Sequence, residues 1–534
     1  MKSKPSVVSV ALYLAMAAGA TEQRASRPSP FTDEFGQFAR DSLHKYHVAG
    51  LSIAVIEGGH IFAEGYGNAT LPDTPARPDT LWYVGSTTKA LVAAVLGQLI
   101  DSKAYPALER GWKTPISSVI RDDFVLQDDW STDHVTLLDA ATHQSGLTAH
   151  DMSLHYSANK SRETIVRDTV RNLRNLPMHL EPHSEFHYNN QMYTALQHVV
   201  ETLTGKWLGD LLKDMIWTPL EMKSSYFDLK DAQAGPEHLS TGYYWHPAQA
   251  KLKAMPLMPT DPMNASGAVI STVVDFAAWV RCLMGRTKPL SEAVHKELLK
   301  PRVVQSAEPG MGTDVTLYSL GWFRTTLYGH AAYWHSGSVD THGALIYWFP
   351  DLDYGVVLLA NYPSPVRYAL MWRLIEDKLR IPKDKRFDIG DRMRREDETK
   401  QREIKNATNV LFPDRPTTPL PPSLKPEAFA GRYRNAGYGI FELRPEKDPS
   451  KPEQTMLVAD RDDFEVRYQL RLQHVSGDFW VAYIESPDRA PGPSAFYRAQ
   501  FNMGADGKAV SLAVTMYDRD EMVMEGVVVY ERTE

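Results

Sequence analysis

The chain has 534 residues, more than one typical domain, so we expect two or three domains. Hydrophobic residues make up 43% and charged residues 23%, which is an ordinary composition for a globular protein. The formal net charge of −8 excludes a broad basic surface for nucleic acid, although a local basic pocket could still bind a small acidic molecule.

The first twenty residues have the pattern of a secretory signal peptide. Lys2 and Lys4 precede an apolar run from Val7 to Ala18, and Ala18-Gly19-Ala20 is a cleavage signal. The run is short for a membrane span and no later stretch approaches that length, so we predict a secreted protein cleaved after Ala20. An uncleaved anchor is the alternative.

Four sequons are candidate glycosylation sites, and they support secretion weakly because sequons also arise by chance: Asn68, Asn159, Asn264 and Asn406.

Cys282 is the only cysteine, so the chain cannot form an intrachain disulfide. It lies in an apolar helical pattern, which favours a buried core thiol. A lone cysteine excludes zinc sites built from several cysteines, and the sequence contains no His-Glu-x-x-His. The sequence therefore implies no metal and no organic cofactor.

The segment from residue 31 to 382 has the pattern of one large mixed α/β unit. A short apolar strand, a Gly58-Gly59 turn and a second strand predict an opening hairpin. Strand 356–361 is apolar almost throughout, which predicts a central position in a sheet, and helix 87–102 is apolar nearly all round, which predicts burial. The expected strands are 51–56, 60–67, 343–350 and 356–361, and the expected helices are 87–102, 191–204, 274–284 and 366–379.

The rest of the chain divides into a connector and a second unit. Residues 383–424 are densely charged up to Lys405 and then proline-rich, which predicts a solvated helix followed by a semi-rigid linker. Residues 425–534 consist of short strands separated by polar turns, for example 438–443 and 479–484. This pattern predicts a small antiparallel β domain, most simply a barrel.

Ser86 and Lys89 form the sharpest local motif. Gly85 makes a turn into the buried helix, so Ser86 lies at the helix start and Lys89 follows on the same face. A lysine in apolar surroundings can have a lowered pKa and act as the base that a serine nucleophile needs, and the helix N-terminus favours an oxyanion near Ser86. The alternative is an N-cap serine with an exposed lysine, which is disfavoured because Lys89 is the only charge on the helix before Asp101.

Tyr188 and Asn190 lie in a polar loop just before helix 191–204. A tyrosine beside a lysine can exchange protons with it, and an asparagine amide can hold both the lysine and a substrate carbonyl. The alternative is a capping asparagine with a packed tyrosine.

His335, Gly337 and Ser338 come just before strand 343–350. A strand at this position can lend backbone N–H groups to the site, and the N–H groups of Ser338 and Ser86 would make a two-donor oxyanion hole. His335 could orient or polarise the site; the alternative is a satisfied edge-strand histidine.

Together, Ser86-x-x-Lys89, Tyr188-x-Asn190 and His335-x-Gly337 resemble the serine β-lactamase and penicillin-binding protein superfamily. The pattern is most similar to the class C β-lactamase-like group of D-aminopeptidases, carboxylesterases and acyltransferases. Residues 137–147 and 267–275 are also similar to that group, and the resemblance covers residues 35 to about 380.

The resemblance implies an antiparallel sheet flanked by helices, with a helical subdomain around residues 100–260 and a lipocalin-like C-terminal domain. Ser86 would form an acyl-enzyme, with proton transfer by Lys89 and Tyr188 and with Asn190 binding Lys89 and the substrate amide. The remaining implied site residues are His335 and Gly337 on the strand edge and Ser338 as the second oxyanion donor.

One departure narrows the expected chemistry. β-Lactamases of this group usually carry Lys-Thr-Gly where this chain has His335-Ser336-Gly337, so an esterase or peptidase is expected rather than a true β-lactamase. Three functions stay open: a secreted hydrolase of small-molecule esters or amides, an acyltransferase with the same chemistry in small-molecule biosynthesis, and a non-catalytic binding protein on this fold. The last is disfavoured because all the motif side chains are present.

Overall fold

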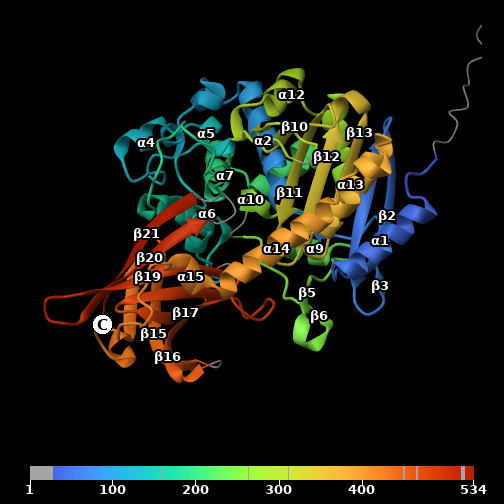
Figure 1. The fold of residues 1–534 in the computed structure, drawn as a ribbon. Coiled ribbons are helices and arrows are strands. Elements are labelled where there is room, and N and C mark those ends of the chain that lie inside the picture. Colours follow the sequence, from blue (N-terminus) through green and yellow to red (C-terminus); the bar gives the residue numbers. More distant parts are fainter. Residues whose placement is uncertain are drawn as a thin grey trace, which may run out of the picture.

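The computed structural model describes residues 28–156, 158–261, 264–310, 312–448, 451–462, 464, 467–518 and 523–533. The predicted signal peptide, residues 1–20, lies outside the described residues. The described chain forms two units, a large sheet with helices on both faces and a closed barrel (Figure 1).

The large sheet has nine strands and is antiparallel throughout. All seven residues of its fourth strand, β13, are buried, which confirms the prediction of a central apolar strand. The predicted hairpin is also confirmed, since β1 and β2 pair directly. In spatial order the strands are β3 (Thr74–Pro75), β2 (His60–Thr70), β1 (Gly50–Glu57), β13 (Tyr354–Ala360), β12 (Gly343–Phe349), β11 (His330–Ser338), β10 (Phe323–Leu327), β9 (Thr316–Tyr318) and β8 (Val303–Ser306).

Both faces of this sheet are covered, because alternate residues of its central strands point to opposite sides. In β1, Ile53 and Val55 pack with α1 (Asp33–Lys45) and α13 (Val366–Lys378). Ala54 and Ile56 pack on the other side with α2 (Thr88–Ser102) and α11 (Val273–Gly285). Buried Cys282 lies on α11, as the sequence indicated.

The region predicted as a helical insertion is mainly helical, with one added hairpin of β5 (Tyr243–His246) and β6 (Lys251–Ala254). Local side chains cap several of these helices; Thr136 and Asp139, for example, form a capping box at the start of α5. The helices are α3 (Ser117–Ile120), α4 (Asp129–His134), α5 (Leu137–Ala141), α6 (Arg162–Asn172), α7 (Gln191–Thr204), α8 (Leu208–Leu212) and α9 (Leu229–Ala234), followed later by α10 (Asn264–Gly267) and α12 (Glu292–Leu299).

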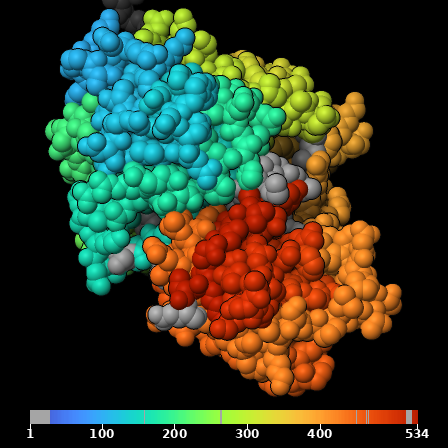
Figure 2. Space-filling view, turned by 90° about the vertical axis from the view of Figure 1, so that its left-hand side faces the viewer, coloured from blue at the N-terminus to red at the C-terminus, as the bar shows by residue number. Residues whose placement is uncertain are grey.

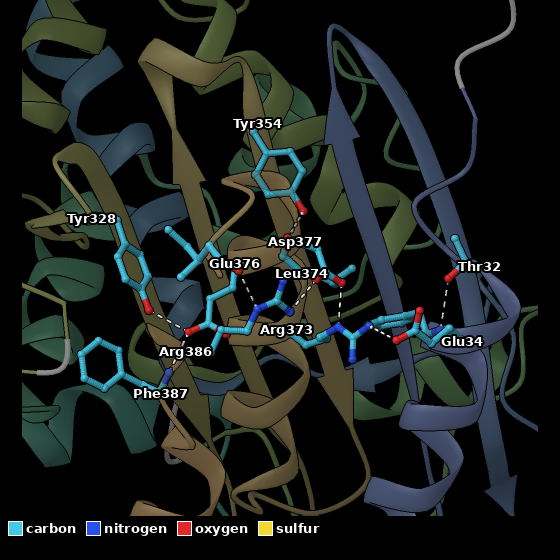
Figure 3. Close-up of polar contacts among 12 residues, drawn as sticks. Thr32, Glu34, Tyr328, Tyr354, Arg373, Leu374, Glu376, Asp377, Arg386 and Phe387 are labelled. Atoms are coloured by element: carbon cyan, nitrogen blue, oxygen red, sulfur yellow. Dashed lines mark hydrogen bonds and ion pairs between the residues drawn. The ribbon is translucent and has the colours of Figure 1, made fainter. Parts of the chain in front are cut away.

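The connector is held against the sheet unit at its start. Arg386 donates to Asp377 of α13 at 2.6 Å, and the Phe387 N–H donates to the buried carboxylate of Glu376 at 3.0 Å (Figure 3). The charged run then forms α14 (Ile389–Lys405), followed by α15 (Ala407–Leu411). The proline-rich stretch lies along the barrel, where the Leu420 N–H donates to the Ser476 hydroxyl at 3.0 Å.

The second unit is a closed antiparallel barrel of eight strands in sequence order (Figure 1). Its interior is filled by side chains such as Tyr433, Trp480 and Phe501, so it is a packed core and not a channel. The strands are β14 (Gly431–Asn435), β15 (Gly439–Asp448), β16 (Lys451–Arg461), β17 (Tyr468–Ser476), β18 (Phe479–Glu485), β19 (Ala495–Met503), β20 (Ala509–Asp518) and β21 (Val523–Arg532).

The barrel packs against the helical part of the first unit (Figure 2). The Tyr438 hydroxyl lies 2.6 Å from His150 Nδ1, and the Asn172 amide donates to the Gly437 carbonyl at 2.9 Å. On another side of the contact, Arg489 forms an ion pair with Asp340. One hydrophobic cluster runs through both units, so they share a core.

Candidate active site

Ser86 lies on a tight turn at the start of the buried helix α2. The turn is a 3-10 helix over Gly85–Thr87, and Gly85 has φ +53, a left-handed conformation that glycine adopts at little cost. The residue before the turn is anchored by a backbone hydrogen bond, in which the Val84 N–H donates to the Val269 carbonyl at 3.0 Å. Ser86 is half-buried and lines a cavity, as a nucleophile must.

Lys89 is fully buried directly behind Ser86. Its ammonium nitrogen lies 3.1 Å from Ser86 Oγ, 2.8 Å from Asn190 Oδ1 and 2.8 Å from the Ser266 carbonyl. Burial lowers the pKa of Lys89 to about 7, while the nearby Asp151 carboxylate acts in the opposite direction. A substantial share of neutral lysine is therefore available near neutral pH to accept the Ser86 proton.

Two aromatic rings enclose the same ammonium group. The ring centroids of Tyr188 and Tyr193 lie 4.8 and 5.3 Å from Lys89 Nζ. The structure thus brings Tyr188 to Lys89, as the sequence predicted, and adds Tyr193, which the sequence reasoning did not identify. The hydroxyl oxygen of Tyr188 is buried.

Asn190 connects Lys89 to an acidic residue that sequence reasoning missed. Its Oδ1 accepts from Lys89, and its Nδ2 donates to both carboxylate oxygens of Asp151 at 3.1 Å. The amide nitrogen expected to meet a substrate is therefore already bonded. No local motif marks Asp151, which reaches the site only through tertiary packing.

The end of β11 lies against the Ser86 turn. Pairing with β10 stops at Trp334, so residues 335–338 have β12 on one side and the turn on the other. At Gly337 a Cβ atom would collide with the Val84 carbonyl, so this approach requires glycine. A Cβ atom at Gly85 would lie 2.7 Å from the Ser338 backbone nitrogen, which places that N–H beside Ser86.

His335 is near the site but does not line the cavity among the described residues. Its Nε2 lies 3.1 Å from the Tyr318 hydroxyl and its Nδ1 lies 2.6 Å from the Ser336 carbonyl. Burial lowers the pKa of His335 to about 3, so the imidazole is neutral. His335 thus packs behind Tyr188, at a ring distance of 6.4 Å, and is placed to support the site instead of touching a substrate.

His143 is a second buried imidazole that the motifs did not single out. Its ring stacks on Tyr188 at 4.2 Å, and its Nδ1 accepts from the Asn189 N–H at 3.1 Å. Burial holds the pKa of His143 well below its usual range, so this ring is neutral too. The stacking holds the Tyr188 ring in its orientation beside Lys89.

The four candidate glycosylation sites differ in exposure. Asn159 and Asn406 are exposed, Asn68 is half-buried with its side chain bonded to the Pro72 carbonyl, and the side chain of Asn264 is outside the described part. No helix within the described ranges is both long and apolar enough to cross a membrane. In the same part of the chain, no cluster of three His, Cys, Asp or Glu side chains could hold a metal ion.

Comparison with known proteins agrees with this architecture. Residues 35–380 match the Beta-lactamase family, and residues 415–525 match a domain of unknown function, DUF3471. The chain is 33% identical to the unguisins hydrolase ungD' of Aspergillus campestris, over 90% of this chain and 88% of that protein. It is 34% identical to the unguisins hydrolase ungD of Aspergillus violaceofuscus, over 85% and 83%.

The fold of both units also has a solved counterpart. A penicillin-binding protein homologue from Pyrococcus abyssi superposes with a TM-score of 0.56 at 19% identity, covering 93% of this chain and 99% of that one. The chain thus has the fold of the β-lactamase and transpeptidase class, carried together with a C-terminal barrel. It belongs to the Beta-lactamase family and is a serine hydrolase of that family.

Proposed function

We propose that the protein hydrolyses ester or amide substrates through an acyl-enzyme on Ser86. The observation that carries the proposal is the contact of a buried lysine, with a pKa of about 7, and the Ser86 hydroxyl at 3.1 Å. A neutral amine in this position can take the hydroxyl proton as the oxygen attacks.

In the first step, Ser86 Oγ forms a bond to the substrate carbonyl carbon while Lys89 accepts its proton. The carbonyl oxygen becomes an oxyanion that the Ser86 and Ser338 N–H groups can stabilise. The proton then passes, with Tyr188 as the second carrier, to the departing alcohol or amine, and the acyl group stays on Ser86. In the second step water loses a proton to the same groups, attacks the acyl carbonyl and releases the acid, which restores the Ser86 hydroxyl.

Hydrolysis is the better supported outcome because both fungal relatives are named unguisins hydrolases. An unguisin-type compound is therefore one candidate substrate. Transfer of the acyl group to an alcohol or amine would use the same Ser86 chemistry, and adding such an acceptor during turnover would separate the two outcomes.

We also propose secretion, on the strength of the signal-peptide pattern in residues 1–20.

The test is the intact mass of the mature protein after incubation with an activated acyl ester, compared with Ser86→Ala. We expect one acyl adduct on the wild type and none on the variant. An equal adduct on Ser86→Ala, or no adduct and no turnover, would contradict the proposal. Adduct lifetimes on Lys89→Ala and Tyr188→Phe would then show which step each side chain serves.

A further inference from the structure

The cavity beside Ser86 is formed by both units of the protein. It has a volume of about 340 Å³, at the lower end of the range for small-molecule sites. On the catalytic side its apolar lining is Met152, Leu154, Met258 and Val339, and on the barrel side it is Phe464, Tyr468, Ile484, Ala495 and Tyr497. The barrel therefore supplies a large part of the apolar wall.

The contributing barrel residues are interior-facing positions near one mouth of the barrel. In β18, Ile484 shares a face with Ala482 and Trp480, which lie deeper in the barrel core, whereas Tyr483 points outward toward α15. In β19, Tyr497 shares a face with Ala499 and Phe501 in the same way. The mouth of the barrel thus opens onto Ser86, and the packed barrel core forms its floor.

Two acidic residues line this cavity together with one basic residue, Arg489, among the residues that the structure describes. Arg489 donates from Nε to Asp340 at 2.8 Å and makes a second contact with the other carboxylate oxygen, a bidentate pair. Asp151 accepts from Asn190. A substrate carboxylate would therefore meet an arginine already occupied by an acid, together with a second acid.

A second arginine lies behind the wall, not in it. Arg461 is 1% exposed, its guanidinium lies 4.0 Å from the Phe464 ring centroid and 5.6 Å from that of Tyr468, and it donates to the Tyr438 carbonyl at 2.7 Å. The guanidinium holds the rings of Phe464 and Tyr468 in place, and these rings line the cavity whereas Arg461 itself does not.

We propose that the barrel mouth is the acyl pocket of the enzyme and selects neutral acyl donors with a bulky, ring-sized apolar group near the scissile carbonyl. The inference rests on the proposed Ser86 acyl-enzyme, because an acyl group bound to Ser86 has to occupy the space beside it. The barrel is then a specificity element of the active site.

The test uses p-nitrophenyl esters, which share one leaving group and differ in the acyl part. Acetate is the minimal substrate, hydrocinnamate carries a ring, and isocaproate and succinate form a pair of similar size in which an isopropyl group is replaced by a carboxylate. We expect kcat/KM for hydrocinnamate to exceed that for acetate by about tenfold or more, and isocaproate to exceed succinate by a similar factor.

Barrel variants locate the preference. Tyr497→Ala and Ile484→Ala should each lower the ratio of kcat/KM for hydrocinnamate to kcat/KM for acetate about tenfold, whereas Tyr497→Phe, which keeps the ring, should lower that ratio much less. Tyr483→Ala, on the outward face of the same barrel, is the matched control and should leave the ratio unchanged. Thermal unfolding followed by circular dichroism shows that each variant is folded.

The outcomes separate this inference from the proposed function. Turnover of acetate with equal rates on isocaproate and succinate, or with ratios that neither pocket variant changes, overturns the acyl pocket and leaves the Ser86 chemistry intact. No turnover of any ester and no adduct on Ser86 overturns the proposed function, and the acyl pocket with it.

Discussion

Lys89 sets the pH range in which the site can react. Since it must be neutral to accept the Ser86 proton and its pKa is about 7, kcat/KM should rise with pH through about 7 and then level off. Asp151 raises this pKa, so Asp151→Asn should lower it and move the rising limb to lower pH. The measurement is the pH profile of kcat/KM on the acetate ester. A limb that stays in place or moves upward would show that another group controls the reaction.

Gly337 allows β11 to reach the nucleophile turn. Gly337→Ala places a Cβ atom against the Val84 carbonyl, so the strand must move away from Ser86 and the oxyanion donor moves with it. We expect kcat to fall about 100-fold or more, because small displacements of positioned groups have effects of that size. Gly310→Ala is the control, since a Cβ atom there has its nearest neighbour at 4.0 Å. Equal activity in the two variants would exclude the tight approach as a requirement.

The side chains on short motifs could be predicted at this scale, and the others could not. Ser86 and Lys89 share a helix face, so sequence spacing alone puts them together. Asp151 and His143 reach the site from the segment between α5 and α6, and His143 has φ +60, a conformation that no sequence pattern indicated here. The resemblance included the stretch around His143 but gave the residue no role.

At the scale of elements, the loop between β18 and β19 contacts the turn that follows β11, the strand that ends at Ser338. Arg489 on the loop is neutralised by Asp340, two residues after Ser338. Asp340→Asn should release Arg489 and raise kcat/KM for the succinate ester relative to isocaproate by about tenfold, the usual effect of one hydrogen bond to a charged group.

The double variant Asp340→Asn/Arg489→Ala supplies the control for that change. It should lose the gain on succinate, because the released cation is gone. A double-mutant cycle of unfolding free energies, with the wild type, Asp340→Asn, Arg489→Ala and the double variant, measures the coupling between the two side chains. Because the ion pair is partly exposed, this coupling free energy should be only about 0.5–1 kcal/mol. A gain on succinate that persists in the double variant would assign it to some group other than Arg489.

Elements with a strong local pattern were predictable, and their contacts were not. The run of β13 is apolar almost throughout, and between Ala90 and Ile100 the run of α2 is interrupted by only one polar residue, Gln98, so both runs indicated burial. The connector has a solvated charge pattern, yet Glu376 and Asp377 of α13 hold its first residues in place (Figure 3). Those bonds join residues about ten positions apart around a turn, and no periodicity encodes them.

For the whole molecule, the shared core predicts that the two units unfold together. A single hydrophobic cluster includes residues of α2, α7 and the barrel strands, and the barrel mouth is closed by the catalytic unit. Calorimetry of the full chain should therefore give one transition. Two separated transitions, with esterase activity lost in only one of them, would show that the barrel is an independent domain.

Three buried neutral histidines of the first unit make the folded state sensitive to acid. Burial lowers the pKa of His150 to about 4 and those of His335 and His342 to about 3. The unfolded chain takes up protons near pH 6.5 that the folded chain does not, so stability is complete above about pH 6.5 and falls as the pH drops toward these values. Each histidine should contribute a loss on the order of 2 kcal/mol in unfolding free energy by about pH 5.

His150 is the informative position because it joins the units. Its Nε2 lies 2.9 Å from the Pro177 carbonyl, which can only accept, so in the neutral ring Nε2 donates there and Nδ1 accepts from the Tyr438 hydroxyl of the barrel. A second proton, on Nδ1, would end the bond in which Nδ1 is the acceptor. His150→Gln should flatten the dependence of unfolding free energy on pH by about one proton. If the variant keeps the wild-type slope between about pH 5 and 7, His150 is not a source of acid sensitivity. A flattened slope would instead mean that the contact holding the barrel over Ser86 is itself weakened by acid.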